Sequence, residues 1–197
     1  MILQAPRLAL REMTDADLPA LRVIFEDPVA MAAYEGPFDD AESADWVARQ
    51  QQRYADDGFG LWAVELSGTG RVIGQCGITR QHLDDEASAE EVIEVGYLFQ
   101  REHWHHGYAV EAASACRDWA FETLEINKLY AKVRDTNIAS MNVAIRLGMT
   151  VRRRFVTHYR GADMPHLAFA ITRAEWTARV GPAPLPQEPR RADEPAQ

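Results

Sequence analysis

The stretch from Glu94 to Glu111, EVGYLFQREHWHHGYAVE, decides the fold of this chain. It begins as an apolar strand over 92–99, passes through a polar turn and enters a helix at Gly107 that continues to about residue 122. The first backbone N–H groups of a helix have no internal partner, and the helix dipole makes that end positive. A strand that feeds a helix through a turn with small residues therefore predicts a phosphate-binding site, with Gly107 and Ala109 allowing close approach.

Two well-known phosphate motifs are excluded for this turn. A P-loop would continue with Gly-Lys-Ser/Thr, and the dinucleotide fingerprint needs further glycines, whereas the turn holds only Gly107. The sequence therefore predicts a pyrophosphate-binding turn of another kind.

Composition limits the classes of protein that need consideration. The 197 residues suit one domain, with 47% hydrophobic and 26% charged residues, and no apolar run approaches membrane-spanning length. Neither a signal peptide nor a disulfide framework is indicated, so we expect a cytoplasmic protein without a membrane partner. The net charge of −9 argues against nucleic-acid binding. It suits cationic partners such as amines or basic peptides, or simply solubility.

Hydrophobic periodicity and turn residues indicate one α+β (mixed α/β) domain over residues 1–178. A polar, acidic exposed loop is expected over 80–91, and the proline-rich segment 179–197 is expected to be a disordered tail. Expected strands cover 7–12, 59–66, 71–78, 92–99, 128–134, 149–159 and 163–172; expected helices begin near 14, 29, 39, 107, 138 and 173.

Four segments in order resemble the GNAT-superfamily acetyltransferases, in the branch of the RimJ/RimL ribosomal-protein N-acetyltransferases. They are RLALREMTDADLPAL, EVGYLF, HHGYAVEA and NIASMNVAIRLGM, and the resemblance spans roughly residues 6–175. It implies a mostly antiparallel sheet, flanked by helices, that splays between its fourth and fifth strands to hold acetyl-CoA. The implied reaction is direct acetyl transfer to a primary amine, either a protein N-terminus or a small molecule. A homodimer is a further implication.

The resemblance also implies which residues bind acetyl-CoA. The backbone of the turn would hold the pyrophosphate, Leu98 and Phe99 would pair with the pantetheine arm, and Asn137 would bond it through its side chain. The family usually has Gln or Arg at the first position of the turn, where this chain has Trp104. The turn residues are His105, His106, Gly107, Tyr108 and Ala109.

Two residues are candidates for catalysis. Glu94 is expected at the mouth of the splay as the base that deprotonates the amine, with Glu91 as the fallback and an ordinary solvated or ion-paired carboxylate as the alternative. The family's usual acid, a tyrosine in the helix after Asn137, is replaced here by Ala144. Ser140 is expected to act as acid or positioning group, or else to bond backbone as helix serines do. A backbone N–H near Leu98 is expected to stabilise the oxyanion.

The replacement at Ala144 supports an alternative reading, a catalytically weak or inactive module that binds or senses acyl-CoA. Other features are weaker. The cluster His103–His106 lacks companion ligands, so no metal is expected. Cys116 is expected to be a packed residue rather than a nucleophile. His158, Tyr159 and His166 are candidates for the acceptor side.

Overall fold

The computed structural model describes residues 1–34, 36–83, 90–159 and 161–180. In this part of the chain, eight strands form one sheet in the order β1-β2-β3-β4-β5-β6-β8-β7. All neighbours are antiparallel except β5 and β6. The strands are β1 Leu3–Gln4, β2 Leu8–Arg11, β3 Leu61–Leu66, β4 Val72–His82, β5 Glu91–Phe99, β6 Lys128–Arg134, β7 Thr150–Tyr159 and β8 Ala162–Thr172. The predicted α+β class is thereby confirmed.

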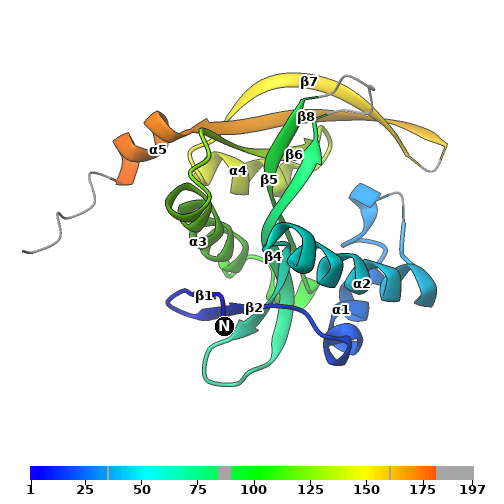
Figure 1. Cartoon of the computed structure of the whole chain (residues 1–197). Coiled ribbons are helices and arrows are strands. Elements are labelled where there is room, and N and C mark those ends of the chain that lie inside the picture. Colours follow the sequence, from blue (N-terminus) through cyan, green and yellow to red (C-terminus); the bar gives the residue numbers. More distant parts are fainter. Residues whose placement is uncertain (35, 84–89, 160, 181–197) are drawn as a thin grey trace, which may run out of the picture.

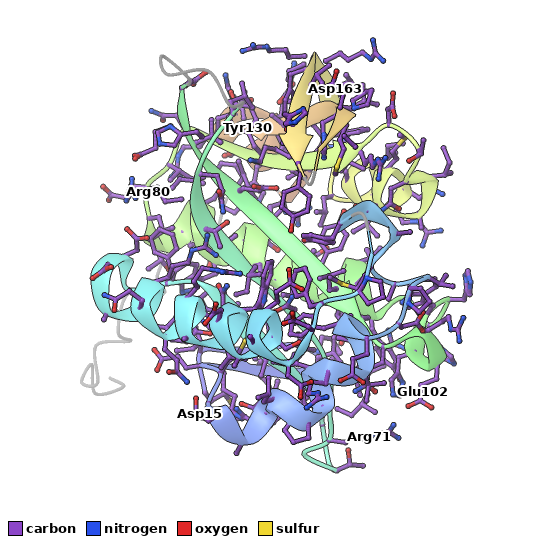
Figure 2. All side chains as sticks on the ribbon, turned by 90° about the vertical axis from the view of Figure 1, so that its right-hand side faces the viewer. Asp15, Arg71, Arg80, Glu102, Tyr130 and Asp163 are labelled. Carbon is purple, nitrogen blue, oxygen red and sulfur yellow. The ribbon has the colours of Figure 1, made fainter. Side chains whose placement is uncertain are left out.

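Helices cover both faces of the sheet (Figure 1). One face packs against α3, and its core includes Trp62, Cys76 and Val95. The other face packs against α1 and α2, and its core includes Phe25 and Val47. Figure 2 views the molecule from the α2 side, with α2 running across the lower part of the face. The helices are α1 Leu18–Phe25, α2 Asp40–Asp57, α3 Tyr108–Thr123, α4 Ile138–Arg146 and α5 Arg173–Val180, with 3₁₀ turns η1 Asp15–Asp17, η2 Ala32–Tyr34 and η3 Arg101–His103.

The sheet opens between β5 and β6, the fourth and fifth strands of the sequence prediction. These parallel strands share one bridge, between Glu94 and Tyr130, whereas β6 pairs with β8 along its whole length. Beyond the bridge the carboxyl ends of β5 and β6 have no ladder between them, so their backbone groups are available to a third partner. The predicted splay is confirmed.

Several predicted boundaries were wrong. The two-residue strand β1 was not expected, because two residues carry no periodic signal. An exposed loop was expected over 80–91, but β4 continues to His82 and β5 begins at Glu91, so both ends of that range are strand. The helix expected over 29–34 is reduced to the 3₁₀ turn η2. Residues 84–89 and 181–197, including nearly all of the predicted tail, lie outside the described residues. None of the described helices is long and apolar enough to cross a membrane.

Candidate active site

The turn before α3 presents an uncapped helix N-terminus. Gly107 occupies the N-cap position with φ +81°, in the left-handed region, and no side chain caps the helix. Glu111 N is the first amide to bond back, to Gly107 O at 3.0 Å, so the amides of residues 108–110 have no helical acceptor. A Cβ on Gly107 would meet only Arg7 Nη2, at 3.6 Å, so glycine is needed here for its backbone angle. This geometry suits an anion.

The side chains of His106 and Trp104 bond to backbone carbonyls, and neither caps the amides of residues 108–110. His106 Nδ1 lies 2.6 Å from Trp104 O, and the imidazole stacks on Tyr108 at a ring-centroid distance of 5.7 Å. Trp104 Nε1 donates to Phe99 O at 2.9 Å. Trp104 therefore ties the turn to the end of β5, which is a different role from that of the charged or amide residue usual at this position.

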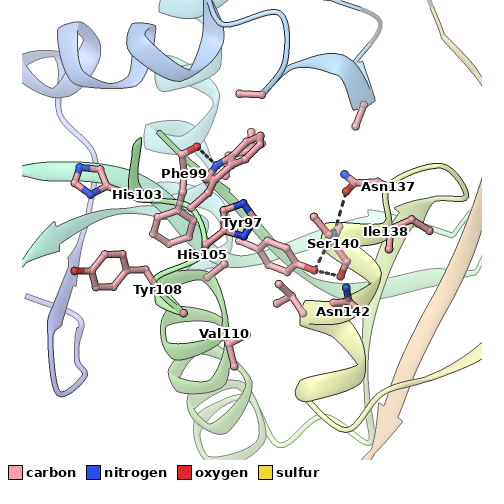
Figure 3. A pocket seen from close by; sticks show the side chains of 18 of the residues that line it. Tyr97, Phe99, His103, His105, Tyr108, Val110, Asn137, Ile138, Ser140 and Asn142 are labelled. Carbon is pink, nitrogen blue, oxygen red and sulfur yellow. Dashed lines mark hydrogen bonds between the residues drawn. The ribbon is translucent and has the colours of Figure 1, made fainter. Parts of the chain in front are cut away.

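A cavity of about 670 Å³ extends from this turn to α4. Figure 3 shows the end of β5 and the start of α3 on one side, and α4 on the other. Of the predicted cofactor residues, all but His106 line it, and so does Ser140. Glu94 does not line it. The lining comprises 29, 30, 32, 33, 97–99, 103–105, 107–110, 136–140, 142, 143 and 146.

The hydrogen-bond pattern of β5 decides which backbone groups face the splay. Gln100 N donates to Ile73 O, and outward and inward groups alternate along an antiparallel strand. The backbone of Leu98 therefore points to β4, where its register partner is Gln75, and the backbones of Tyr97 and Phe99 point into the splay. The backbone of Leu98 is therefore occupied by the ladder with β4, and the backbone of Tyr97 is the group of this pair that faces the splay. The bond from Trp104 to Phe99 O has the same outward direction.

The opposite wall begins with Asn137, the N-cap of α4. Its Oδ1 accepts from Ser140 N at 3.0 Å. That bond fixes the amide plane, and Nδ2 has no hydrogen-bond acceptor among the described residues, so it remains available as a donor in the cavity lining. The predicted position of Asn137 beside Ser140 is confirmed, and its cap role was not anticipated.

Sequence reasoning missed Tyr97 as a site residue. Its hydroxyl lies 2.9 Å from both Ser140 Oγ and Ser140 O, spanning the cavity floor from β5 to α4 (Figure 3). Strand alternation does place Tyr97 opposite Glu94, on the α3 face, but only the fold brings it to a helix 43 residues away. Asn142 and Arg146, also missed, lie on α4 at helical spacings from Ile138.

Glu94 lies at the closed end of the splay rather than at its mouth, because it forms the last bridge between β5 and β6. Its Oε1 accepts from Lys132 N at 3.1 Å, and its Oε2 lies 3.8 Å from Lys132 Nζ. The side chain is 16% exposed. Burial raises the pKa of Glu94, although the charge of Lys132 and the backbone bond oppose this. The carboxyl group is thus poised to exchange a proton nearer neutrality than an ordinary glutamate.

Glu94 and Ser140 lie on opposite sides of β5, and the fold does not join them in one hydrogen-bonded group. The negative charge of Glu94 adds to burial in raising the pKa of Tyr34, so the phenol of η2 shares the Glu94 side of the sheet. Ala32 and Ala33 of the same turn line the cavity. The 3₁₀ turn η2 therefore contributes both to the cavity lining and to the surroundings of Glu94. Glu91, the fallback base, is instead exposed and ion-paired with Arg80 at 2.7 Å.

The other residues considered from the sequence are buried or packed against neighbours. Ala144 is fully buried. Cys116 is also fully buried, with its Sγ 3.6 Å from that of Cys76, and burial raises its thiol pKa, which disfavours the nucleophilic thiolate. Among the described residues, no three His, Cys, Asp or Glu side chains group as metal ligands. His166 stacks on Phe155 at 5.5 Å, and burial lowers its pKa.

Comparisons with known proteins agree with this geometry. Residues 7–150 match the family model described as acetyltransferase (GNAT) domain. The uncharacterized protein YkkB of Bacillus subtilis (strain 168) is 39% identical over 144 residues, covering 73% of this chain and 81% of the relative. The uncharacterized N-acetyltransferase p20 of Bacillus licheniformis is 30% identical over 143 residues, which cover 72% of this chain and 78% of that relative. The crystal structure of the acetyltransferase from Agrobacterium tumefaciens str. C58 superposes with a TM-score of 0.73 at 32% identity, over 87% of this chain and 94% of that one.

The chain belongs to the GNAT family of acetyltransferases. It is an acetyl-CoA-dependent N-acetyltransferase with an amine acceptor. The residues present fit acetyl-CoA, because an uncapped helix end suits a pyrophosphate and outward strand amides suit an amide-bearing arm.

Proposed function

We propose that this enzyme transfers the acetyl group of acetyl-CoA directly to a primary amine, without an acyl-enzyme intermediate. The observation that carries the proposal is the cavity that joins the uncapped start of α3 to Asn137 and Ser140 on α4. In this proposal the amides of residues 108–110 bind the pyrophosphate. The outward backbone of Tyr97 and Phe99 and the Nδ2 of Asn137 bind the pantetheine arm.

The amine approaches from the α1–α2 side in this proposal, and Glu94 accepts its proton. A base with a pKa closer to the working pH is more effective for this step, and burial shifts Glu94 in that direction. Glu94 sits behind the cavity rather than in its lining, so a water molecule would carry the proton between amine and carboxylate. The outward N–H of Tyr97 or Phe99 is the candidate donor to the oxyanion.

The acceptor is proposed to be either a protein N-terminal amine or a small-molecule amine. Both classes present a primary amine that must be neutral to attack, which gives Glu94 the same task with each. Homodimerisation belongs to the same proposal, and it would change the walls available to a long acceptor.

Isothermal titration with CoA and steady-state thiol release on an amine panel test the proposal together. The panel should hold N-terminal peptides, amino acids, polyamines and aminoglycosides. We expect CoA to bind and at least one acceptor to raise thiol release above the rate without amine. Binding without turnover on any acceptor would instead support the acyl-CoA-binding module, and no binding would overturn both readings.

A further inference from the structure

Tyr97 and Ser140 form a hydroxyl pair that the proposed transfer reaction does not yet use. The Tyr97 hydroxyl lies 2.9 Å from Ser140 Oγ and 2.9 Å from Ser140 O, and both residues line the cavity. They come from opposite walls of the splay, β5 and α4 (Figure 3). The pair therefore crosses the space in which the proposed function places the thioester arm.

The positions of the two protons follow from what each atom can do. The carbonyl oxygen of Ser140 can only accept, so a bond from Tyr97 to that oxygen uses the single phenolic proton. The contact between the two hydroxyl oxygens then uses the Ser140 proton. Both protons are held within the pair in this arrangement. If the phenolic O–H rotates to donate to Ser140 Oγ, the Ser140 O–H becomes free to point into the cavity. Both hydroxyl groups keep their protons.

The α4 helix offers no phenol of its own at the position where the family resemblance places one. Ala144 is fully buried there, so the helix carries a methyl group inside the core. Ser140, Asn142 and Arg146 are the polar side chains that line the cavity from α4 itself, and none of them is a phenol. A phenol reaches the same helix from β5 instead.

We propose that Tyr97 is the positioning residue for departure of the thiolate: its hydroxyl donates to Ser140 Oγ, and Ser140 thereby donates its own hydrogen bond to the sulfur. The inference rests on the proposed acetyl transfer. In the step concerned, the amine nitrogen has bonded to the carbonyl carbon, the C–S bond breaks, and its electron pair goes to sulfur. The proton lost by the amine goes to Glu94, and the thiolate takes a proton from water on release.

The pair stabilises the thiolate by hydrogen bonds and keeps both of its protons. Burial raises the pKa of Tyr97, so a phenolate would be disfavoured at neutral pH. Thiols are far stronger acids than alcohols, with a pKa of about 8.5 for the cysteine side chain, so a thiolate can leave without full protonation and donated hydrogen bonds suffice. Hydrogen bonds to a charged acceptor are roughly twice as strong as neutral ones, and a chain of two polarises further.

A double-mutant cycle on kcat tests the proposal, with Tyr97→Phe, Ser140→Ala and the double variant. Each single variant removes the same hydrogen-bond chain, so we expect each to lower kcat by about tenfold, and the double variant to be no slower than Ser140→Ala. The Kd for CoA should stay within about twofold in all three, because the pair acts on the leaving group rather than on binding. In a Ser140→Thr background, which retains a hydroxyl, Tyr97→Phe should still lower kcat.

Tyr54→Phe is the matched control. Tyr54 is also a largely buried phenol whose hydroxyl donates to a backbone carbonyl, that of Leu61, and it lies outside the cavity. Its loss should lower the melting temperature without changing kcat. The proposal is overturned if the effects of Tyr97→Phe and Ser140→Ala multiply, or if Tyr97→Phe behaves like Tyr54→Phe.

Failure of the proposed function is separable from failure of this inference. If wild-type protein acetylates no amine, the same cycle is measured on hydrolysis of acetyl-CoA in the binding site, which releases the same thiolate. An equal loss of hydrolysis rate in both single variants would then support the role of the Tyr97–Ser140 pair, while the proposed amine acceptor would be overturned. Unchanged hydrolysis in both would overturn the role of the pair.

Discussion

Glu94 Oε1 accepts a hydrogen bond from Lys132 N at 3.1 Å, just past the last bridge between β5 and β6. A continued parallel ladder would have given that amide a backbone carbonyl of β5. The carboxylate takes the place of the carbonyl, so the strands can separate without leaving a buried N–H unpaired. One side chain thus serves as the terminus of the ladder and as the candidate base. The two roles are separable, because glutamine retains the acceptor oxygen and loses the ability to take a proton.

Glu94→Gln should lower kcat/KM at neutral pH by about 100-fold, a typical contribution of a general base. Wild-type activity should fall as the pH drops below the raised pKa of Glu94, and the variant should lose this limb. Steady-state rates across pH, with the acceptor varied at saturating acetyl-CoA, measure both. Glu91→Gln is the control, since Glu91 is exposed and paired with Arg80, and it should leave the profile unchanged. The reverse result would move the base to Glu91.

The same substitution should change how stability depends on pH. The pKa of Glu94 is higher in the folded than in the unfolded chain, so the folded state binds the proton more tightly. Stability therefore falls as the pH rises from the unfolded value of about 4.3 through the folded value. Glu94→Gln removes this loss, and its melting temperature relative to wild type should rise as the pH increases above about 4.3. Melting curves across that range provide the measurement.

Glu175→Gln provides a control of opposite sign. The backbone N–H of Thr172 and the Arg152 guanidinium lower the pKa of Glu175 to about 2. Its stabilisation is present above the unfolded pKa and lost as the pH falls through the folded one. Glu175→Gln should therefore have a lower melting temperature than wild type at neutral pH. If the melting temperature relative to wild type changed with pH in the same direction in both variants, the raised pKa of Glu94 would be contradicted.

Gly107→Ala should weaken CoA binding by about tenfold, because the left-handed angle costs a residue with a Cβ roughly 1–2 kcal/mol. The nearest atom to such a Cβ is 3.6 Å away, so the effect would come from the backbone of the turn rather than from a clash. Titration with CoA measures it. Gly58→Ala is matched in strain, with φ +78° and no atom within 4 Å, at the end of α2. Gly58→Ala should lose stability and keep its CoA affinity. An equal loss of CoA affinity in the two variants would argue against CoA binding by the turn before α3.

Asn137→Ala should cost about 1 kcal/mol of stability through the lost cap. It should also raise the Kd for CoA, because the Nδ2 donor is removed. Asn137→Asp keeps the capping oxygen and loses only the donor, so its stability should approach wild type while the CoA affinity stays reduced. Chemical denaturation and CoA titration on the same samples separate the two effects.

Asp39→Ala controls for capping alone. Asp39 caps α2 through a bond from Glu42 N at 2.8 Å and lies outside the cavity. It should lose a similar stability to Asn137→Ala and bind CoA as wild type does. Reduced CoA affinity in Asp39→Ala would show that global stability, rather than the Asn137 amide, controls binding.

The sequence by itself determined the local parts of this site. The strand, turn and helix around Gly107 were readable from the sequence, and so were the β6 strand at Lys128–Arg134 and an α4 helix that begins after Asn137 and ends at Gly148. Each depends on neighbours within a few residues. The order of those parts also pointed to the family, and through it to acetyl-CoA and the splay.

Only the tertiary structure decided how the two walls meet. Glu94 was expected at the mouth of the splay and lies at its closed end, because the position of the last bridge depends on the relative register of two strands far apart in the chain. The contact of Tyr97 with Ser140 joins residues 43 positions apart, and no periodicity within either element encodes such a distance. Propensity and pattern act over a few residues, whereas the chemistry of this site is set by packing between β5 and α4.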